Sequence, residues 1–89
     1  MINDKEIDHI MNQIKKLMIQ KNKTYGDNNI IEMGEQGVMF RLSDKMIRLK
    51  NIVMNKVKTP EDETLEDTYL DIAGYAIIGL MLKRNKFQK

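Results

Sequence analysis

Three carboxylates, Glu63, Asp67 and Asp71, are spaced four residues apart, and residues 72–82 that follow them carry no charge. A four-residue spacing puts side chains on one face of a helix. Acids on a helix that other elements cover should be paired, bound to a cation or part of a ligand site. Mg²⁺ takes carboxylate oxygens and shares its remaining positions with water and phosphate. The row therefore predicts a divalent-cation site, with Asp67 and Asp71 as the strongest candidates and Glu63 as the third.

Two other interpretations of this acidic row stay open. Acids are common in the first half of a solvated helix, where the helix dipole favours negative charge. The row can also form a structural network of salt bridges with basic residues of a neighbouring helix. Carboxylates four residues apart are common in proteins, so their spacing alone does not decide between these roles.

A second charged pattern precedes the acids. Arg41, Asp44, Lys45 and Arg48 follow one another at i, i+3, i+4 and i+7, which places them on one helix face. Arginine and lysine are the side chains that bind phosphate oxygens. The pattern predicts that Arg41, Lys45 and Arg48 contact phosphates, and that Asp44 orients an arginine or joins the metal site. Pairing with the acidic row and an ordinary solvated face are the alternatives.

Apolar periodicity predicts three principal helices and no strand, so the fold class is all-α in a single domain spanning residues 1–89. The first helix is predicted by an apolar stripe at steps of three and four through Ile7, Ile10, Met11, Ile14, Leu17 and Met18. The second is expected at about residues 37–55. The third is expected at about residues 60–84, with Thr59 as its N-cap and Pro60 at its first position.

Residues 21–37 are polar and rich in turn-forming types, so the sequence predicts a loop of about a dozen residues here. The loop leaves room for a short helical turn at residues 30–33, which Gly34 and Gly37 would limit. Tyr25 in this loop is suited to stack on a base, or equally to close the core.

The composition excludes several classes of protein. The chain has 89 residues, no cysteine and one histidine, His9, which argues against disulfides, thiolate or histidine metal sites and a Ser-His-Asp triad. Its net charge of +2 does not predict specific binding to nucleic acid. No apolar run approaches the roughly 18 residues of a membrane helix, and the first residues lack a signal-peptide pattern. We expect a cytoplasmic protein with no membrane partner.

The third predicted helix is apolar on more than one side. Leu65, Tyr69 and Ile72 share one face, while the line of the acids continues on a nearly opposite face through Ile78. Three helices do not easily cover such an element, so we expect a homodimer or higher homo-oligomer that completes a bundle with residues 72–82 at its centre. Gly74 and Gly79 would permit close approach of helices.

Three blocks of sequence together resemble the nucleotide modification associated domain proteins of phages, prophages and bacteria. These blocks are Lys-Asn-Lys-Thr-Tyr-Gly-Asp at 21–27, Arg-Leu-Ser-Asp-Lys-Met-Ile-Arg-Leu at 41–49 and Asp-Glu-Thr-Leu-Glu-Asp-Thr-Tyr-Leu-Asp-Ile-Ala-Gly-Tyr-Ala at 62–76. They occur in the order that this family shows and cover about residues 21–82. The family looks like a distant relative of the MazG-type all-α nucleoside triphosphate pyrophosphohydrolases.

This resemblance implies a helical, Mg²⁺-dependent domain that takes nucleoside triphosphates and cleaves the bond between the α- and β-phosphates. If the chain is encoded by a phage, it would act in the host cytoplasm. The implied metal ligands are Asp67, Asp71 and Glu63. The implied phosphate contacts are Arg41, Lys45 and Arg48, and the residues implied to lie near the ligand are Tyr25, Asp27 and Asp44.

The chain departs from the MazG pattern at the metal site. MazG-type enzymes pair Glu-x-x-Glu on one helix with Glu-x-x-Asp on the next. Here the second helix offers Arg41-x-x-Asp44, and the third offers Glu63-x-x-x-Asp67, which is one residue longer. The catalytic residues are therefore left unassigned.

Three functions remain open from the sequence. The first is a Mg²⁺-dependent nucleoside triphosphate pyrophosphohydrolase or an accessory of nucleotide modification. The second is a non-catalytic protein that binds and sequesters nucleotides or cyclic nucleotides. The third is a small helical interaction module.

Overall fold

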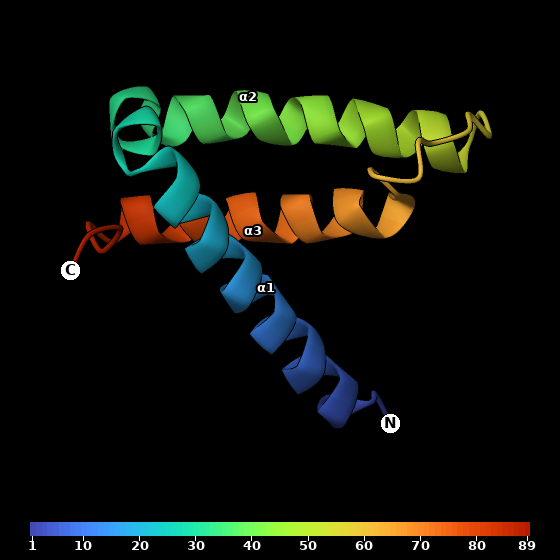
Figure 1. Cartoon of the computed structure of the whole chain (residues 1–89), viewed down its shortest axis with the longest axis horizontal. Helices are drawn as coiled ribbons and strands as arrows, with labels where there is room; N and C mark the ends of the chain where they lie inside the picture. The colour runs from blue at the N-terminus through green and yellow to red at the C-terminus, as the bar shows by residue number, and fades with distance from the viewer.

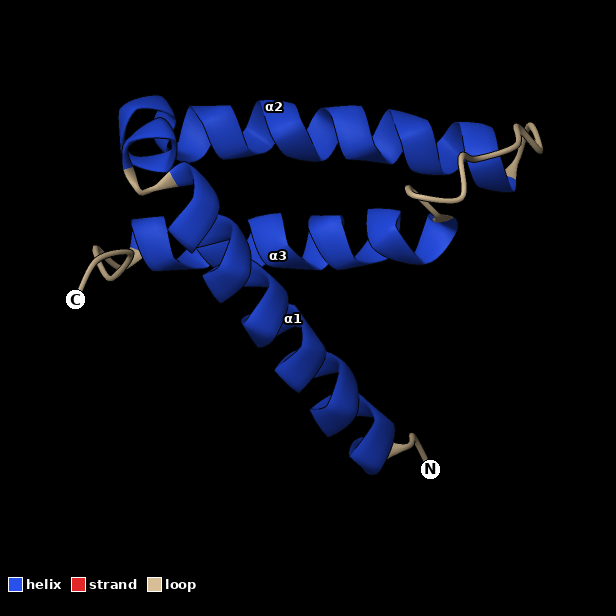
Figure 2. Ribbon diagram, viewed as in Figure 1, coloured by secondary structure: helices blue, strands red, loops and turns tan.

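The computed structural model describes residues 1–89 and contains three helices: α1 (Asp4–Tyr25), α2 (Asn28–Val53) and α3 (Leu65–Lys83). No residue is in a strand, as the colouring of Figure 2 shows. The all-α class with three principal helices is therefore confirmed. None of the three helices has the length and apolar composition that spanning a bilayer requires.

The helices α2 and α3 lie side by side and run in opposite directions, while α1 crosses α3 at a steep angle (Figure 1). Small residues of α3 bring the other two helices close. A Cβ atom at Gly74 would lie 3.7 Å from Cγ of Met18 on α1, and one at Gly79 would lie 3.4 Å from Cγ1 of Val38 on α2. The close approaches predicted at these glycines thus occur between helices of one chain.

The core of a single chain is very small. Only Ile14 and Val38 are buried among the hydrophobic side chains, although 42% of the sequence is hydrophobic. The N-terminal half of α1 extends beyond the α2–α3 pair (Figure 1), and its apolar stripe is exposed there. Burial of apolar surface is the main force that stabilises a fold. In a single copy of this chain, a large part of the apolar surface remains exposed to water and contributes nothing to stability.

The long loop predicted for residues 21–37 is wrong. The first helix continues to Tyr25, and α2 begins only two residues after Gly26, at Asn28. The turn is held by the carboxylate of Asp27, which accepts hydrogen bonds from the side chains of Asn22 (2.7 Å) and Gln88 (2.9 Å). The polar residues before it belong to an exposed helix end, where helix formation tolerates them.

A kink at Gly34 divides α2. Its backbone angles, φ 59° and ψ −157°, lie far from helical values, in a region that is essentially accessible to glycine alone. Figure 1 shows the start of α2 turned away from the line of the remainder. The short helical turn expected near residues 30–33 is thus present, and Gly34 ends it as predicted.

The predicted start of α3 at Pro60 is wrong by five residues. The N-cap is Thr64: its hydroxyl accepts from the backbone N–H of Asp67 at 3.3 Å, while Oδ2 of Asp67 accepts from the backbone N–H of Thr64 at 2.8 Å. This reciprocal capping box satisfies two backbone donors at once. It therefore competes successfully with the Thr59–Pro60 signal. As a result, Glu63 precedes the helix, and the acidic row within α3 is reduced to Asp67 and Asp71.

Replacing Gly34 with alanine tests the kink. A Cβ at this position meets no atom within 4 Å, so the cost comes from the backbone conformation and should be about 1–3 kcal/mol. Urea unfolding measures it. The matched control is Gly79→Ala, where the backbone is helical and stability should stay equal or rise by up to about 1 kcal/mol. Equal stabilities of Gly34→Ala and the parent chain would contradict the assigned strain.

Candidate functional site

The candidate site is organised around the carboxylate of Asp71, which meets one lysine from each of the other two helices. Lys21 of α1 lies 2.8 Å from its Oδ1, and Lys45 of α2 lies 3.0 Å from its Oδ2. The side chains of Asp71 and Lys45 are only 14% and 22% exposed. Each carboxylate oxygen therefore has its own cation, and the ion pairs connect all three helices at one point.

The charges of this cluster reinforce one another. Partial burial disfavours the charged form of Asp71, but the hydrogen bonds from Lys21 and Lys45 outweigh it and lower the pKa of the carboxyl below its usual value. Partial burial likewise disfavours charged Lys45, and the hydrogen bond and charge of Asp71, with a contribution from Glu63, raise the pKa of the lysine. Both groups are therefore ionised at neutral pH.

Arg48 has a largely structural position at the end of this charged face. Its Nη2 donates to the backbone carbonyl of Glu63 at 2.8 Å, and its Nε donates to Oγ1 of Thr68 at 3.2 Å. Thr68 is 1% exposed, and the Glu63 carboxylate lies 3.5 Å from Lys45 and 3.8 Å from Arg48. Arg48 thus fastens the segment before α3 to α2, and much of its hydrogen-bonding capacity is already used.

Arg41 differs from the other basic residues of the face because it forms no ion pair. Its guanidinium lies 5.9 Å from the centre of the Tyr75 ring, and its Nη2 lies 3.6 Å from Sδ of Met33. Asp44 is exposed and likewise has no ion pair. The chemical capacity of Arg41 therefore remains available to a ligand.

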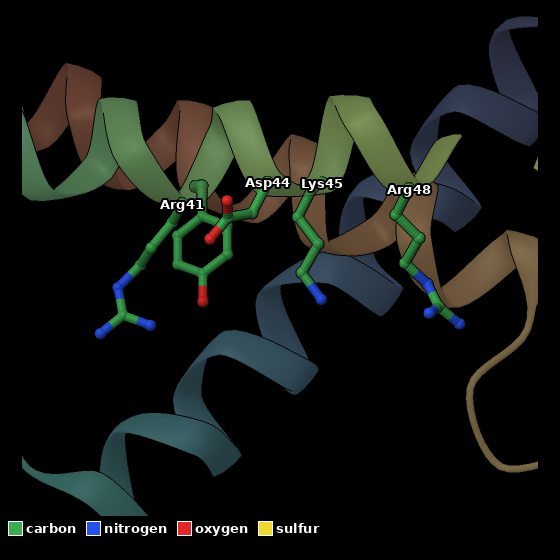
Figure 3. A pocket seen from close by; sticks show the side chains of 5 residues that line it. Arg41, Asp44, Lys45 and Arg48 are labelled. Atoms are coloured by element: carbon green, nitrogen blue, oxygen red, sulfur yellow. The ribbon is translucent and has the colours of Figure 1, made fainter. Parts of the chain in front are cut away.

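These side chains surround a shallow pocket of about 280 Å³ on α2. Figure 3 shows Arg41, Asp44, Lys45 and Arg48 along α2 at the pocket. Tyr75 of α3 also lines it, with its ring close to the Arg41 guanidinium. We call it the Arg41 pocket; its lining residues are Arg41, Asp44, Lys45, Arg48 and Tyr75. It combines cationic donors for an anion with one aromatic ring, which is a combination suited to a phosphorylated aromatic ligand.

The carboxylates predicted to hold a metal are engaged elsewhere. Asp67 caps α3 through two hydrogen bonds with Thr64, which lower its pKa. Asp71 is neutralised by two lysines, and Glu63 lies beside Lys45 and Arg48. No three carboxylate or histidine side chains gather closely enough to hold a metal ion. This donor set does not fit a Mg²⁺ site made by the protein alone.

Tyr25 and Asp27 lie at the turn between α1 and α2. Both line a broad groove of about 1190 Å³ between α1 and α3, which also reaches Arg41, Lys45 and Tyr75. The two hydrogen bonds from Asn22 and Gln88 lower the pKa of Asp27. The structure therefore places both residues along one groove with the Arg41 pocket, although Asp27 is occupied in holding the turn.

Two residues of the site were not predicted, Lys21 and Tyr75. Lys21 follows Ile14 and Leu17 along the apolar stripe of α1, at i+7 and i+4. A lysine on the covered face of a helix indicates a buried partner, and this signal was available. Tyr75 comes one helical turn after Asp71 and thus shares its face, but only the packing of α2 on α3 brings it to Arg41.

The ion pairs of Asp71 predict a specific dependence of stability on pH. Because its folded-state pKa is depressed, its contribution is fully present above the unfolded pKa of about 3.9 and is lost as the pH falls through the folded value. Asp71→Asn should lower the free energy of unfolding by about 1–2 kcal/mol at pH 7. The difference from the parent chain should shrink as the pH falls below about 4, through the depressed folded-state pKa.

Urea unfolding at several pH values checks this expectation. Asp62→Asn, at an exposed position without an ion pair, is the control and should change little. A stability difference for Asp71→Asn that stays constant across the range would refute the proposed electrostatic role.

Comparison with known proteins bears on this site directly. A family model described as nucleotide modification associated domain 1 matches residues 21–82, which contain every charged residue of the candidate site. No curated protein and no solved structure that was compared matches the chain, so the relation to MazG-type enzymes stays a prediction. The match covers well over half of the sequence, and the chain belongs to the nucleotide modification associated domain 1 family.

Proposed function

We propose that this chain binds a nucleotide through its phosphate groups at the Arg41 pocket. The observation that carries the proposal is an unpaired guanidinium beside an aromatic ring, on a face that also holds Lys45. The family description supports an association with nucleotide chemistry. An arginine binds phosphate through paired charge-assisted hydrogen bonds, and the Tyr75 ring beside it offers a surface on which a base can stack.

The arrangement of charges favours binding over metal-centred chemistry. Lys21, Lys45 and Arg48 share the two carboxylates of Asp71 and Glu63. These ion pairs therefore leave one positive charge in excess close to the pocket. Positive charge attracts phosphates, whereas Mg²⁺ is held through one or two carboxylates that are free to coordinate it, and the carboxylates of Asp67 and Asp71 are engaged in the α3 cap and in ion pairs. A non-catalytic protein that binds or sequesters nucleotides, cyclic nucleotides included, is therefore the function that the geometry supports best.

Substitution of Arg41 tests phosphate binding. Isothermal calorimetry with a panel of nucleoside triphosphates, their deoxy forms and cyclic dinucleotides should identify a ligand. Arg41→Ala should raise the dissociation constant of that ligand by about tenfold or more. Two controls should keep the affinity. Lys50→Ala removes an exposed positive charge from the same helix, and Asp67→Ala removes the α3 cap and should lower stability only.

The panel also separates the remaining functions. Equal losses for Arg41→Ala and Lys50→Ala would show that only net charge attracts the ligand. Absence of binding to every nucleotide would refute the proposal and leave a helical interaction module as the function.

Magnesium-dependent hydrolysis of nucleoside triphosphates is the second candidate. The observation that favours it is Asp44, a carboxylate without an ion pair in the wall of the Arg41 pocket. Incubation with Mg²⁺ and each triphosphate, followed by detection of pyrophosphate and monophosphate, tests it. An active protein should lose turnover in Asp44→Asn, and absence of both products across the panel would exclude hydrolysis. A free nucleotide as ligand or substrate agrees with a cytoplasmic location.

We propose further that the chain acts as a homo-oligomer. Its support is the exposure of large hydrophobic side chains on all three helices, among them Met11, Phe40 and Leu80. Because burial of apolar surface is the main force that stabilises a fold, the exposure of these side chains favours their burial against a second copy. Light scattering gives the mass directly, and a value near 10.5 kDa at all concentrations would refute self-association.

A further inference from the structure

The N-terminal half of α1 is an apolar surface without a partner in the chain. The C-terminal half of the same helix packs on α3, with Met18 against Gly74 and Lys21 on Asp71. Beyond this contact the helix continues into solvent (Figure 1), and Ile7, Ile10 and Met11 are 40%, 40% and 56% exposed. The apolar stripe of α1 therefore extends beyond the part of the helix that α3 covers.

Charges are arranged along one edge of this stripe in a self-complementary way. At about 100° per residue, Asp4, Asp8, Met11 and Lys15 fall on the same edge. The acids lie toward the N-terminus, Lys15 lies toward the C-terminus, and Met11 stands between Asp8 and Lys15. These two are about 10 Å apart along the helix, and neither forms an ion pair within the chain.

We propose that two copies of this chain pair through the N-terminal halves of their α1 helices, antiparallel and about a two-fold axis near Met11. In this arrangement the same edge of each helix meets its copy. Asp8 of one protomer then lies opposite Lys15 of the other, and the contact is repeated by symmetry. Ile7, Ile10 and Met11 are covered by the corresponding residues of the second copy.

The distribution of charge also selects among other arrangements. Parallel helices would put Asp8 level with Asp8 and Lys15 level with Lys15, and like charges at a close contact are destabilising. A lipid surface fits poorly, because the free end of α1 carries Asp4, Glu6 and Asp8 against the single basic residue Lys5, whereas cytoplasmic leaflets are negatively charged.

This interface would adjoin the candidate site. Met11 and Lys15 line the groove between α1 and α3 that reaches Asp71 and Tyr75. A second copy on the free half of α1 would therefore lie along the outer part of that groove. The proposal rests on the self-association proposed above and does not depend on nucleotide binding, which calorimetry measures separately.

Charge exchange tests the pairing. Asp8→Lys and Lys15→Asp should each raise the dissociation constant of the dimer severalfold to about tenfold at low salt, because each creates two like-charge contacts. The double variant exchanges both charges and should return to within about twofold of the parent chain. Sedimentation equilibrium measures the constants. Lys16→Asp, on the opposite side of the helix, is the control and should leave the constant unchanged.

A cysteine variant provides a test that does not depend on weakening the fold. The natural chain contains no cysteine, so Met11→Cys introduces a single thiol near the proposed axis and should form a disulfide-linked dimer on mild oxidation. His9→Cys, on the outer face of α1, should not. A dimer in which the double charge exchange fails to restore affinity, or in which Met11→Cys does not cross-link, would overturn this pairing; a strictly monomeric chain would overturn self-association itself.

Discussion

The ion pairs of Asp71 with Lys21 and Lys45 are the interaction on which the arrangement of this molecule depends. They join α1, α2 and α3 at one partly buried point, in a chain whose buried hydrophobic side chains number only two. With so little apolar surface buried, packing alone specifies the position of α1 weakly. A carboxylate that is removed from water is stable only if cations remain beside it, so the three helices must meet where these three side chains meet.

This constraint divides the charged face of α2 into two parts. Toward the α2–α3 connection, Arg48 holds the segment before α3 through the Glu63 carbonyl and Thr68, and its role is largely structural. Toward the start of α2, Arg41 has no ion pair and stands beside Tyr75. Lys45 lies between the two parts and belongs to both. A ligand therefore finds open hydrogen-bonding capacity mainly at Arg41, although the spacing in the sequence treats the three basic residues as equivalent.

The same shortage of apolar contacts explains the surfaces that the chain leaves open. Helix α3 covers the apolar stripe of α1 over half of the length of the stripe. The other half, toward the N-terminus, is exposed to water (Figure 1). Electrostatic pairing thus positions the helices within one copy, while most of the apolar surface remains available between copies. The groove between α1 and α3 connects the two features, since it is lined both by the free part of α1 and by residues around Asp71.

The sequence by itself determined the helical class, the number of helices and the face that carries Arg41, Lys45 and Arg48, because periodicity and spacing act within one helix. It also pointed to Gly34 as the end of a short helical turn. A local contact, the capping box of Thr64 with Asp67, set the start of α3 and engaged the Asp67 carboxylate. Tertiary structure alone decided the role of Asp71, because Lys21, distant in the sequence, reaches it across the crossing of α1 and α3. A pattern of spacing states which side chains share a face, whereas the pairing of charges depends on which faces meet.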